Sequence, residues 1–542
     1  MTYKFLIVLL LLAATQFFSV ATAQTASINK ATSKFENWYN LDLSLDKKFG
    51  MSVDRAYEEL LKGKKSKTVI VAIIDSGVDI FHEDLQGKIW TNQKEIPGNG
   101  IDDDHNGYID DVHGWSFLGN SKGENIAFEN TELCRLYKKL DPKYKDIRPE
   151  QINSSDSAEY HFYQKIKAKY NEEYEKAKKE VNKIAPFAAN YQLADSLMSA
   201  YLKKSEYTLE DIKAVDPDTV KSLKFSKELL LFIYKQKNFD KSDFKDYIHQ
   251  VFVKLYCYYN PDFNPRVLVG DNPEDITDIK YGNNDVIGPQ PDHGTHVSGI
   301  VAANRDNGIG VKGVAENVLI MSLRVVPDGD ERDKDIALAI RYATNMGAKV
   351  INMSFGKDYS PQKKFVDDAV KYAVANDVLF VHAAGNDAKN SDITDSYPSN
   401  ILLDKSTVKA SWITVGASSQ EFGKNLPASF SDYGKKEVDV FAPGVSIYNL
   451  KPGNLYKEND GTSMASPMVS GLAALLRSYF PGLSAPKIKE CILKSVTIYP
   501  RKVFRPEEGN KKRHKIRFTE LSVSGGVVNA FNAVKLAEEM SK

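Results

Sequence analysis

The sequence predicts an α/β fold with a mostly parallel central sheet and an inserted helical subdomain. The apolar run Thr68–Ile74 is typical of a strand buried on both faces of a parallel sheet. Strand and helix patterns then alternate between Val318 and Gly416, which indicates parallel strands joined by crossover helices. Between these regions the segment 123–270 carries helical patterns, so we expect it to interrupt the α/β domain.

The charge balance argues against a polyanionic partner. Lys plus Arg and Asp plus Glu number 72 each, and the formal net charge is zero. No global field therefore draws the chain toward nucleic acid or anionic lipid, and we expect no nucleic-acid partner.

The N-terminus has the pattern of a cleavable signal peptide. Lys4 precedes the apolar run Phe5–Ala14, and Ala21-Thr22-Ala23 supplies the small residues of a cleavage site. We expect residues 1–23 to be removed, leaving 24–48 as a polar N-terminal segment. The alternative is a membrane anchor, but no stretch approaches the roughly 20 apolar residues needed to span a bilayer. The mature chain is therefore expected to be secreted or periplasmic, with no integral membrane segment.

The first predicted strand ends on a carboxylate. A helix is expected over Met51–Leu61, followed by the strand Thr68–Ile74, which Asp75 closes. Functional groups collect at the carboxyl ends of strands in open parallel sheets. Asp75 is therefore a candidate functional residue, although a turn aspartate that caps a loop is the alternative.

An acidic loop follows between Gly98 and Asp111. Oxygen-bearing residues recur at every second position, and Gly107 at the sixth permits a sharp turn, as in an EF-hand calcium loop. The expected ligands are the side chains of Asp102, Asp104, Asn106 and Asp110 and the carbonyl of Tyr108. The twelfth position is His113 instead of glutamate, and a solvated acidic turn is the alternative. Calcium would serve here as a structural cofactor.

The segment 123–270 is predicted to be helical, and its partner is unknown. Apolar and aromatic residues recur at steps of three and four, which is one face of an amphipathic helix. They are Tyr163, Ile166, Tyr170, Tyr174, Ala177, Val181 and Ile184. Ser155 and Asp156 are expected to cap this helix and Pro186 to stop it. Further helices are expected over Phe225–Tyr234 and Lys241–Tyr258.

Three cysteines permit at most one disulfide. Cys134 and Cys257 both lie in the helical segment and are the expected pair. The alternative is three free thiols.

The second half of the chain supplies the alternating elements. Strands are expected over Val318–Val325, Ala348–Met353, Val378–Ala383 and Trp412–Gly416, with helices over Asp333–Met346 and Pro361–Asn376. A buried helix over Met468–Leu476 follows the small-residue turn Gly461–Pro467.

That turn places Ser463 near a helix N-terminus, where it could act as a nucleophile. A serine hydroxyl needs a general base and a third group that orients the base. His293 and His296 are both candidates for the base, because residues three apart share one helix face and spacing does not separate them. Asp75 is the candidate for the orienting carboxylate.

Three blocks together resemble the subtilisin-like serine proteases. They are Asp75-Ser76-Gly77, His293-Gly294-Thr295-His296 and Gly461-Thr462-Ser463-Met464-Ala465-Ser466-Pro467, in the chain order Asp, His, Ser. The resemblance implies a three-layer fold and a secreted serine endopeptidase that acts on polypeptides. It further implies that His293 is the base, His296 is structural, and the catalytic domain covers residues 49–122 and 271–542.

The same resemblance implies further site residues. Ser354-Phe355-Gly356 is similar to a family segment that pairs with the substrate, and Ala384 and Gly385 belong to a second such segment that ends at Asn386. Asn386 would donate to the oxyanion of the tetrahedral intermediate. Asp84 matches a family calcium ligand, and its partner Asp306 lies in the loop 304–311.

Two other functions stay open. A catalytically silent chain of this fold could act as a binding protein through its helical segment. A narrow-specificity maturation protease is the other possibility, with the helical segment restricting access to the cleft.

Overall fold

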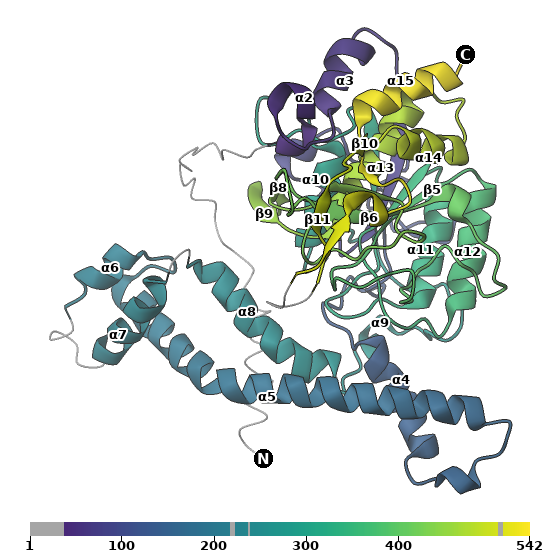
Figure 1. The fold of residues 1–542 in the computed structure, drawn as a ribbon. Helices are drawn as coiled ribbons and strands as arrows, with labels where there is room; N and C mark the ends of the chain where they lie inside the picture. The colour runs from purple at the N-terminus through teal and green to yellow at the C-terminus, as the bar shows by residue number, and fades with distance from the viewer. Residues whose placement is uncertain (1–36, 217–222, 237–238, 508–512) are drawn as a thin grey trace. The chain divides into compact units, whose positions relative to one another are not determined.

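The computed structural model describes residues 37–216, 223–236, 239–507 and 513–542. A nine-stranded sheet lies at its centre, in the order β10-β13-β7-β6-β5-β4-β1-β3-β2 (Figure 1). Its strands are β1 (Val69–Asp75), β2 (Gly114–Ser116), β3 (Val318–Arg324), β4 (Val350–Met353), β5 (Leu379–Ala383), β6 (Trp412–Ser418), β7 (Val440–Pro443), β10 (Thr497–Ile498) and β13 (Gly526–Val527). β10 and β13 pair antiparallel, and the other neighbours pair in parallel. The mostly parallel sheet expected from the sequence is confirmed.

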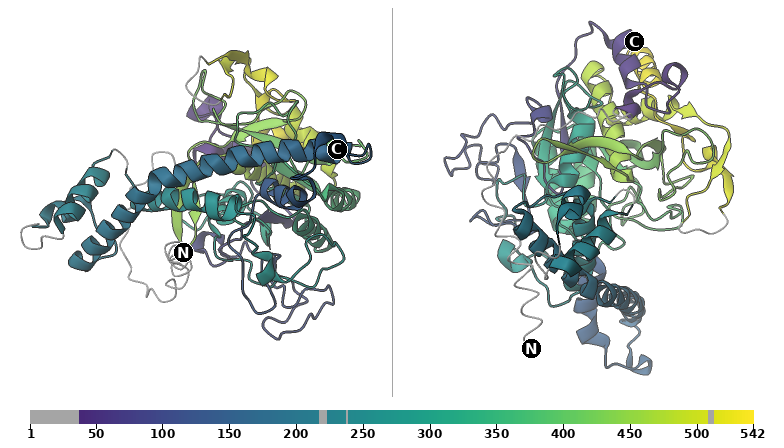
Figure 2. Two further views of the ribbon diagram at one scale, coloured as in Figure 1. Left: turned by 90° about the horizontal axis from the view of Figure 1, so that it is seen from below. Right: turned by 90° about the vertical axis from the view of Figure 1, so that its left-hand side faces the viewer.

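Helices cover both faces of this sheet (Figure 2). They are α10 (Asp292–Ala302), α11 (Asp333–Asn345), α12 (Lys363–Ala375), α13 (Thr462–Tyr479), α14 (Ala485–Lys494) and α15 (Ala530–Met540). α10 and α13 contribute to one core and α11 and α12 to the other. The three-layer α/β fold is therefore confirmed.

β1 shows why its apolar run has no polar alternation. Val71 and Ile73 pack into the first core, whereas Ala72 and Ile74 pack into the second. Both faces of the strand are covered, so each side chain contributes to a hydrophobic core. Because β1 lies between β3 and β4, Asp75 at its carboxyl end stands in the interior of the sheet.

Short elements complete the α/β domain. Two hairpins pair β8 (Ile447–Lys451) with β9 (Leu455–Asn459) and β11 (Lys502–Phe504) with β12 (Lys515–Arg517). The predicted helix over Met51–Leu61 consists of α3 (Val53–Ala56) and the π-helical turn η2 (Tyr57–Leu61). α2 (Leu43–Asp46) precedes them.

The end of the segment expected to be polar belongs to the core. Trp38 and Tyr39 are almost completely buried, and their polar atoms are paired. The Trp38 Nε1–H donates to the Ser446 carbonyl at 3.1 Å, and the Tyr39 hydroxyl donates to the Lys312 carbonyl at 3.0 Å. The signal peptide expected over residues 1–23 lies outside the described residues.

The helical segment is built on one long helix. α5 (Ser157–Leu202) contains 46 residues. α4 (Glu132–Tyr144) and α8 (Lys241–Val253) pack along it. α6 (Leu209–Ala214) and α7 (Leu223–Tyr234) lie near its C-terminal end (Figure 1). The π-helical turn η5 (Lys254–Tyr258) extends α8, and α9 (Arg266–Val269) follows. The expected helices over Phe225–Tyr234 and Lys241–Tyr258 are confirmed.

The expected stop at Pro186 is wrong, because α5 continues for 16 residues beyond it. Proline lacks an N–H, so the helix loses one backbone hydrogen bond at this point. Tyr191, Ala194 and Met198 follow the proline and pack into a core shared with α7. This burial stabilises the second half of the helix and outweighs the local loss.

A buried ionic cluster joins the end of the helical segment to the α/β domain. Arg266 of α9 contacts Asp335 of α11 at 2.9 Å and Asp271 at 2.5 Å. Lys334 also contacts Asp271, at 3.1 Å. All four side chains are nearly inaccessible, so removal of one partner would leave a buried charge unpaired.

The expected disulfide between Cys134 and Cys257 is wrong. Both are free thiols, as is Cys491. Cys134 instead packs among Leu133, Leu136 and Ile166 between α4 and α5. Desolvation raises the pKa of both Cys134 and Cys257 to about 12, so they behave as packing residues.

Among the described residues, no helix combines the length and the apolar character required to cross a bilayer.

Candidate active site

Asp75, at the carboxyl end of β1, contacts the candidate base His293. Asp75 as a whole residue is 1% exposed. Its Oδ1 accepts hydrogen bonds from the Nδ1 of His293 at 2.7 Å and from the Ser76 N–H at 2.7 Å. An oxygen that accepts from the imidazole Nδ1 leaves Nε2 as the nitrogen free to take a proton. The geometry therefore gives His293 the orientation that a general base needs.

The approach of α10 to β1 depends on Gly294. A Cβ at this position would lie 2.1 Å from the Gly77 carbonyl oxygen and 3.3 Å from the Asp75 Cβ. Any side chain would push the start of α10 away from the end of β1. Glycine after the histidine is thus required for the contact between His293 and Asp75.

The pKa of His293 is raised above its usual value. Burial by itself lowers this pKa, but the negative charge of Asp75 and its hydrogen bond outweigh the effect. The imidazole side chain retains 39% of its exposure, so a substrate or solvent proton can reach it.

His296, the other candidate that spacing leaves open, lies in different surroundings from His293. It is 1% exposed, and its Nε2 lies 3.0 Å from the Ile447 carbonyl and 3.2 Å from the Lys457 carbonyl. Desolvation lowers its pKa to about 4, which keeps the ring neutral. The contacts tie α10 to the β8–β9 hairpin.

Ser463 is the second residue of α13, and Pro467 leaves the Ser463 carbonyl without its usual helical hydrogen bond. Proline at this position has no N–H to donate to the Ser463 carbonyl four residues earlier. The Ser354 hydroxyl donates to that carbonyl instead, at 3.0 Å, and is itself 2.8 Å from the Ser466 hydroxyl. A side chain at the end of β4 therefore positions the start of α13.

The hydroxyl of Ser463 donates to the Ser354 carbonyl at 3.0 Å. Among the described residues, no hydrogen bond joins it to His293. α10 and α13 nevertheless pack against each other, so the two side chains extend from adjacent helices. Catalytic hydrogen bonds in unliganded enzymes often form only when the substrate binds.

Asn386 is oriented by Thr462, a residue that the sequence analysis did not single out. The side-chain oxygen of Asn386 accepts from the Thr462 N–H at 2.9 Å and from the Thr462 hydroxyl at 3.0 Å. The same hydroxyl accepts from the Gly385 N–H at 3.2 Å. With its oxygen occupied, Asn386 has its amide N–H₂ group left to donate to a substrate oxygen.

A cavity of about 350 Å³ joins these residues. Its lining includes Ser463, Asn386 and Gly385, together with the segment Ser354–Gly356. Ala384, the remaining expected substrate-binding residue, lines a neighbouring cavity of about 290 Å³ with His382 and Trp412. The two cavities share the residues Ser391 and Thr394–Ser396.

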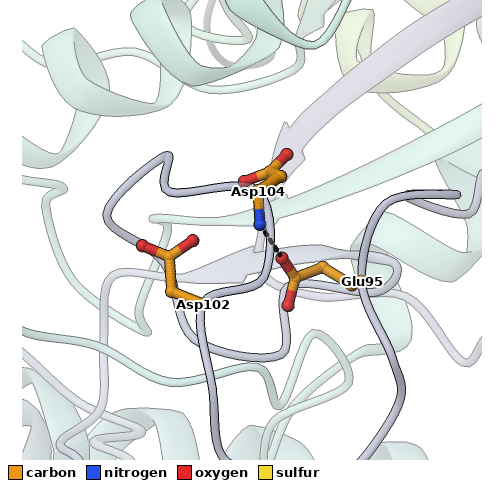
Figure 3. A group of neighbouring side chains, drawn as sticks. All are labelled: Glu95, Asp102 and Asp104. Atoms are coloured by element: carbon orange, nitrogen blue, oxygen red, sulfur yellow. Dashed lines mark hydrogen bonds between the residues drawn. The ribbon is translucent and has the colours of Figure 1, made fainter.

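The expected calcium loop contains a group of carboxylates (Figure 3). Oxygen atoms of Glu95, Asp102 and Asp104 lie within 4.8 Å of one another, and the Asp104 N–H donates to Glu95 at 3.1 Å. Glu95 was not expected from the sequence, because it precedes the loop pattern. Burial raises its pKa, and the charges of Asp104 and Asp103 act in the same direction.

The expected side-chain ligands of this loop also have protein partners. Asp102 accepts from the N–H groups of Asn106 and Gly107 at 3.0 and 2.8 Å, and Asp104 accepts from the Asn106 N–H at 3.1 Å. The carboxylate of Asp110 accepts from the Gly98 N–H at 2.8 Å and the Gly100 N–H at 2.9 Å, which caps the turn. The side-chain oxygen of Asn106 accepts from the Tyr108 N–H at 2.8 Å.

Asp84 meets the loop 304–311, as the resemblance implies. Its carboxylate is buried and accepts from the Asn307 amide at 2.7 Å and the Val311 N–H at 2.9 Å. Desolvation raises the pKa of Asp84, and these hydrogen bonds oppose the shift. Asp306 is exposed, and Asn307 makes the contact in its place.

The raised pKa of His293 should depend on Asp75. In a Ser463→Ala background, we expect nuclear magnetic resonance of labelled histidine to give His293 a pKa above 6.5, and the Asp75→Asn change to lower it. Below this pKa the imidazole is protonated and cannot act as a base, so activity should fall as the pH drops through it. A pKa that Asp75→Asn leaves unchanged would contradict the assigned contact. Because the chain has nine histidines, His293→Gln and His296→Gln serve to assign the two signals.

Comparison with known proteins gives the family. The model of the subtilase family matches residues 66–518. A thermophilic serine proteinase of Bacillus sp. (strain AK1) is 40% identical over 222 residues, which cover 41% of this chain and 49% of that protein. Subtilisin DY of Bacillus licheniformis is 41% identical over 207 residues, which cover 38% of this chain and 70% of that protein. A solved protease structure from Pseudoalteromonas arctica PAMC 21717 is 27% identical, and the match covers 49% of this chain and 82% of that protein's chain. Its TM-score of 0.39 is too low to compare the folds. The chain belongs to the subtilase family.

Proposed function

We propose that this chain is a serine endopeptidase that hydrolyses polypeptides through an acyl-enzyme. The observation that supports this most directly is the 2.7 Å contact between Asp75 and the Nδ1 of His293. This contact orients a base beside α13, and Ser463, the second residue of α13, lines the cavity. Family membership and the protease names of the relatives agree with this assignment.

In the proposed reaction, His293 acts first as base and then as acid. Its Nε2 takes the proton of the Ser463 hydroxyl while Oγ attacks the carbonyl carbon of the scissile bond. The negative charge that develops on the carbonyl oxygen is stabilised by the Asn386 amide and the Ser463 N–H. The imidazolium gives its proton to the leaving amine, and water then hydrolyses the acyl-enzyme by the same steps.

Asp75 and Thr462 contribute by positioning. Asp75 holds the tautomer of His293 and stabilises the imidazolium that forms during each half-reaction. Thr462 fixes the amide of Asn386, so that no reorganisation is needed when the oxyanion appears. Removal of the corresponding amide in subtilisin reduces turnover by about 10²- to 10³-fold, which sets the scale for this interaction.

We also propose that calcium stabilises the loop 98–111. Glu95, Asp102 and Asp104 supply the hard oxygen ligands that this ion prefers. The burial of Glu95 beside two carboxylates is unfavourable without a compensating cation, which supports the assignment. Asp84 and the loop 304–311 form a second candidate.

Export from the cytoplasm is proposed on the signal pattern of residues 1–23. N-terminal sequencing of the protein recovered outside the cytoplasm should begin at Gln24. An intact Met1 in that fraction would contradict cleavage at this point.

Ser463 should be the residue that reacts with a fluorophosphonate probe. We expect one adduct on the wild-type chain by intact mass, and none on Ser463→Ala, whose peptide hydrolysis should fall on the order of 10⁶-fold, as in subtilisin. Ser541→Ala, the same change on the C-terminal surface, should label normally. Adduct formation elsewhere would identify another nucleophile, and no labelling or cleavage by the wild type would favour a silent binding protein.

Calcium should raise the melting temperature. A ligand at a hundred times its dissociation constant adds about 2.7 kcal/mol to the free energy of unfolding. We expect Asp102→Asn combined with Asp104→Asn to lose most of the calcium-dependent increase in melting temperature, measured by calorimetry against a chelator. Equal melting temperatures of the wild type with calcium and with chelator would contradict the proposal.

A further inference from the structure

The cavity beside Ser463 is acidic. Its lining contains six carboxylates and two ammonium groups: Asp330, Glu331, Asp358, Asp387, Asp395 and Asp432 against Lys357 and Lys389. This local imbalance contrasts with the zero net charge of the chain. A concave wall of one sign concentrates ligands of the opposite charge.

The two ammonium groups already have carboxylate partners. Lys357 contacts Asp333 at 2.8 Å and Glu132 of α4 at 3.0 Å. Lys389 contacts Asp387 at 2.8 Å and Asp358 at 3.5 Å. Their charges are therefore balanced within these pairs.

Glu331 differs from the other buried carboxylates of the lining. It is 2% exposed, and no described protein group donates a hydrogen bond to its Oε1. By contrast, the Asp330 side chain accepts from the Glu132 N–H at 2.7 Å, and Asp432 accepts from the N–H groups of Asp387 and Lys389 at 3.0 and 2.8 Å. A buried carboxylate oxygen without a donor is unfavourable, so Oε1 points to a partner that arrives from outside the chain.

Several hydrogen bonds nevertheless hold the backbone of Glu331 in place. Its carbonyl accepts from Lys357 at 2.8 Å and from Arg135 of α4 at 3.3 Å, and Arg135 also donates to the Asp330 carbonyl at 3.0 Å. Gly329, with φ +136°, lies so close to Glu129 that a Cβ would be 2.2 Å from the Glu129 carbonyl oxygen. The helical segment thus fixes the backbone of Glu331, while the Oε1 atom of its side chain has no hydrogen-bond donor among the described residues.

From this arrangement we infer that Glu331 binds the guanidinium or ammonium group of a substrate arginine or lysine, at a position on the N-terminal side of the bond that is cut. This inference rests on the proposed protease function and names its substrate class. The cation would supply the hydrogen-bond donors that Oε1 lacks, and a charge-assisted pair with a buried carboxylate oxygen discriminates against neutral side chains. Glu331 would then be a specificity-determining residue held in place by α4.

This preference should depend on pH. Burial raises the pKa of Glu331 to about 7, with Lys357 lowering it and Asp330 raising it. Above this pKa the carboxyl group is ionised and binds a cation; below it the charge and the preference are lost. The charged groups packed around it are Asp330, Arg332 and Asp333 on its own segment, Glu129, Glu132 and Arg135 from the helical side, and Lys357 after β4. Because Asp330 also has a raised pKa, the pH dependence must be compared with and without the Glu331 carboxyl.

The first test is a peptide-library cleavage profile. We expect the wild type to enrich arginine or lysine at least about tenfold at one position before the cleaved bond, and Glu331→Gln to lose this enrichment. Glu421→Gln, the same change at an exposed glutamate outside the cavity, should keep the wild-type profile. Active wild-type enzyme with no basic preference, or a preference that Glu331→Gln retains, would overturn the inference.

The second test uses two peptides that differ only by arginine or citrulline at the selected position. The ratio of their kcat/KM values should rise between pH 5.5 and 8.5 in the wild type and stay flat in Glu331→Gln, because the titration of His293 affects both peptides and divides out. A ratio with equal pH dependence in both enzymes would contradict the role of Glu331. A wild type that neither labels with fluorophosphonate nor cleaves any peptide would instead refute the protease function.

Discussion

The buried hydrogen bond between Asp75 and His293 is the interaction on which the rest of the site depends. The Asp75 carboxylate is 1% exposed, and its Oδ1 accepts from both the imidazole and the Ser76 N–H. The contact requires β1 to lie in the interior of the sheet, where its carboxyl end meets the start of α10, and requires a glycine at position 294 to let the two approach. Without this oriented base, the Ser463 hydroxyl would remain a weak nucleophile.

A second set of contacts holds the nucleophile and the oxyanion donor together. Pro467 leaves the Ser463 carbonyl without its helical partner, and the Ser354 hydroxyl at the end of β4 takes that place. Thr462 joins the start of α13 to Gly385 and Asn386 after β5. The ends of three parallel strands therefore position the candidate catalytic groups, which is how this class of sheet commonly builds its sites.

The sequence predicted the sheet and the principal helices, because apolar periodicity is a local signal. The roles of His293 and His296 rested on the family resemblance, because their spacing does not separate them. It could not predict features that depend on distant contacts. Pro186 indicates a helix end by its own chemistry, yet burial of Tyr191 and Met198 carries α5 past it. Cys134 and Cys257 share a segment but pack as free thiols. Glu95 and Glu331 belong to no sequence motif, and only the fold brings them to the acidic loop and to the cavity. Thr462 lies in the Gly461–Pro467 block, but its contacts with Gly385 and Asn386 depend on the fold.

The helical segment contacts this site through α4. Glu132 and Arg135 of α4 bond to Asp330 and Glu331 in the cavity wall, so the proposed substrate specificity depends on the helical segment.

The central claim is the convergence of Asp75, His293 and Ser463. A crystal structure of the protein with a peptide aldehyde tests it most directly. We predict a covalent bond to Ser463 Oγ, with His293 Nε2 and the Asn386 amide each within about 3.2 Å of an oxygen of the adduct. An adduct on another residue, or an imidazole roughly 10 Å from Oγ and so beyond the reach of proton transfer, would contradict it.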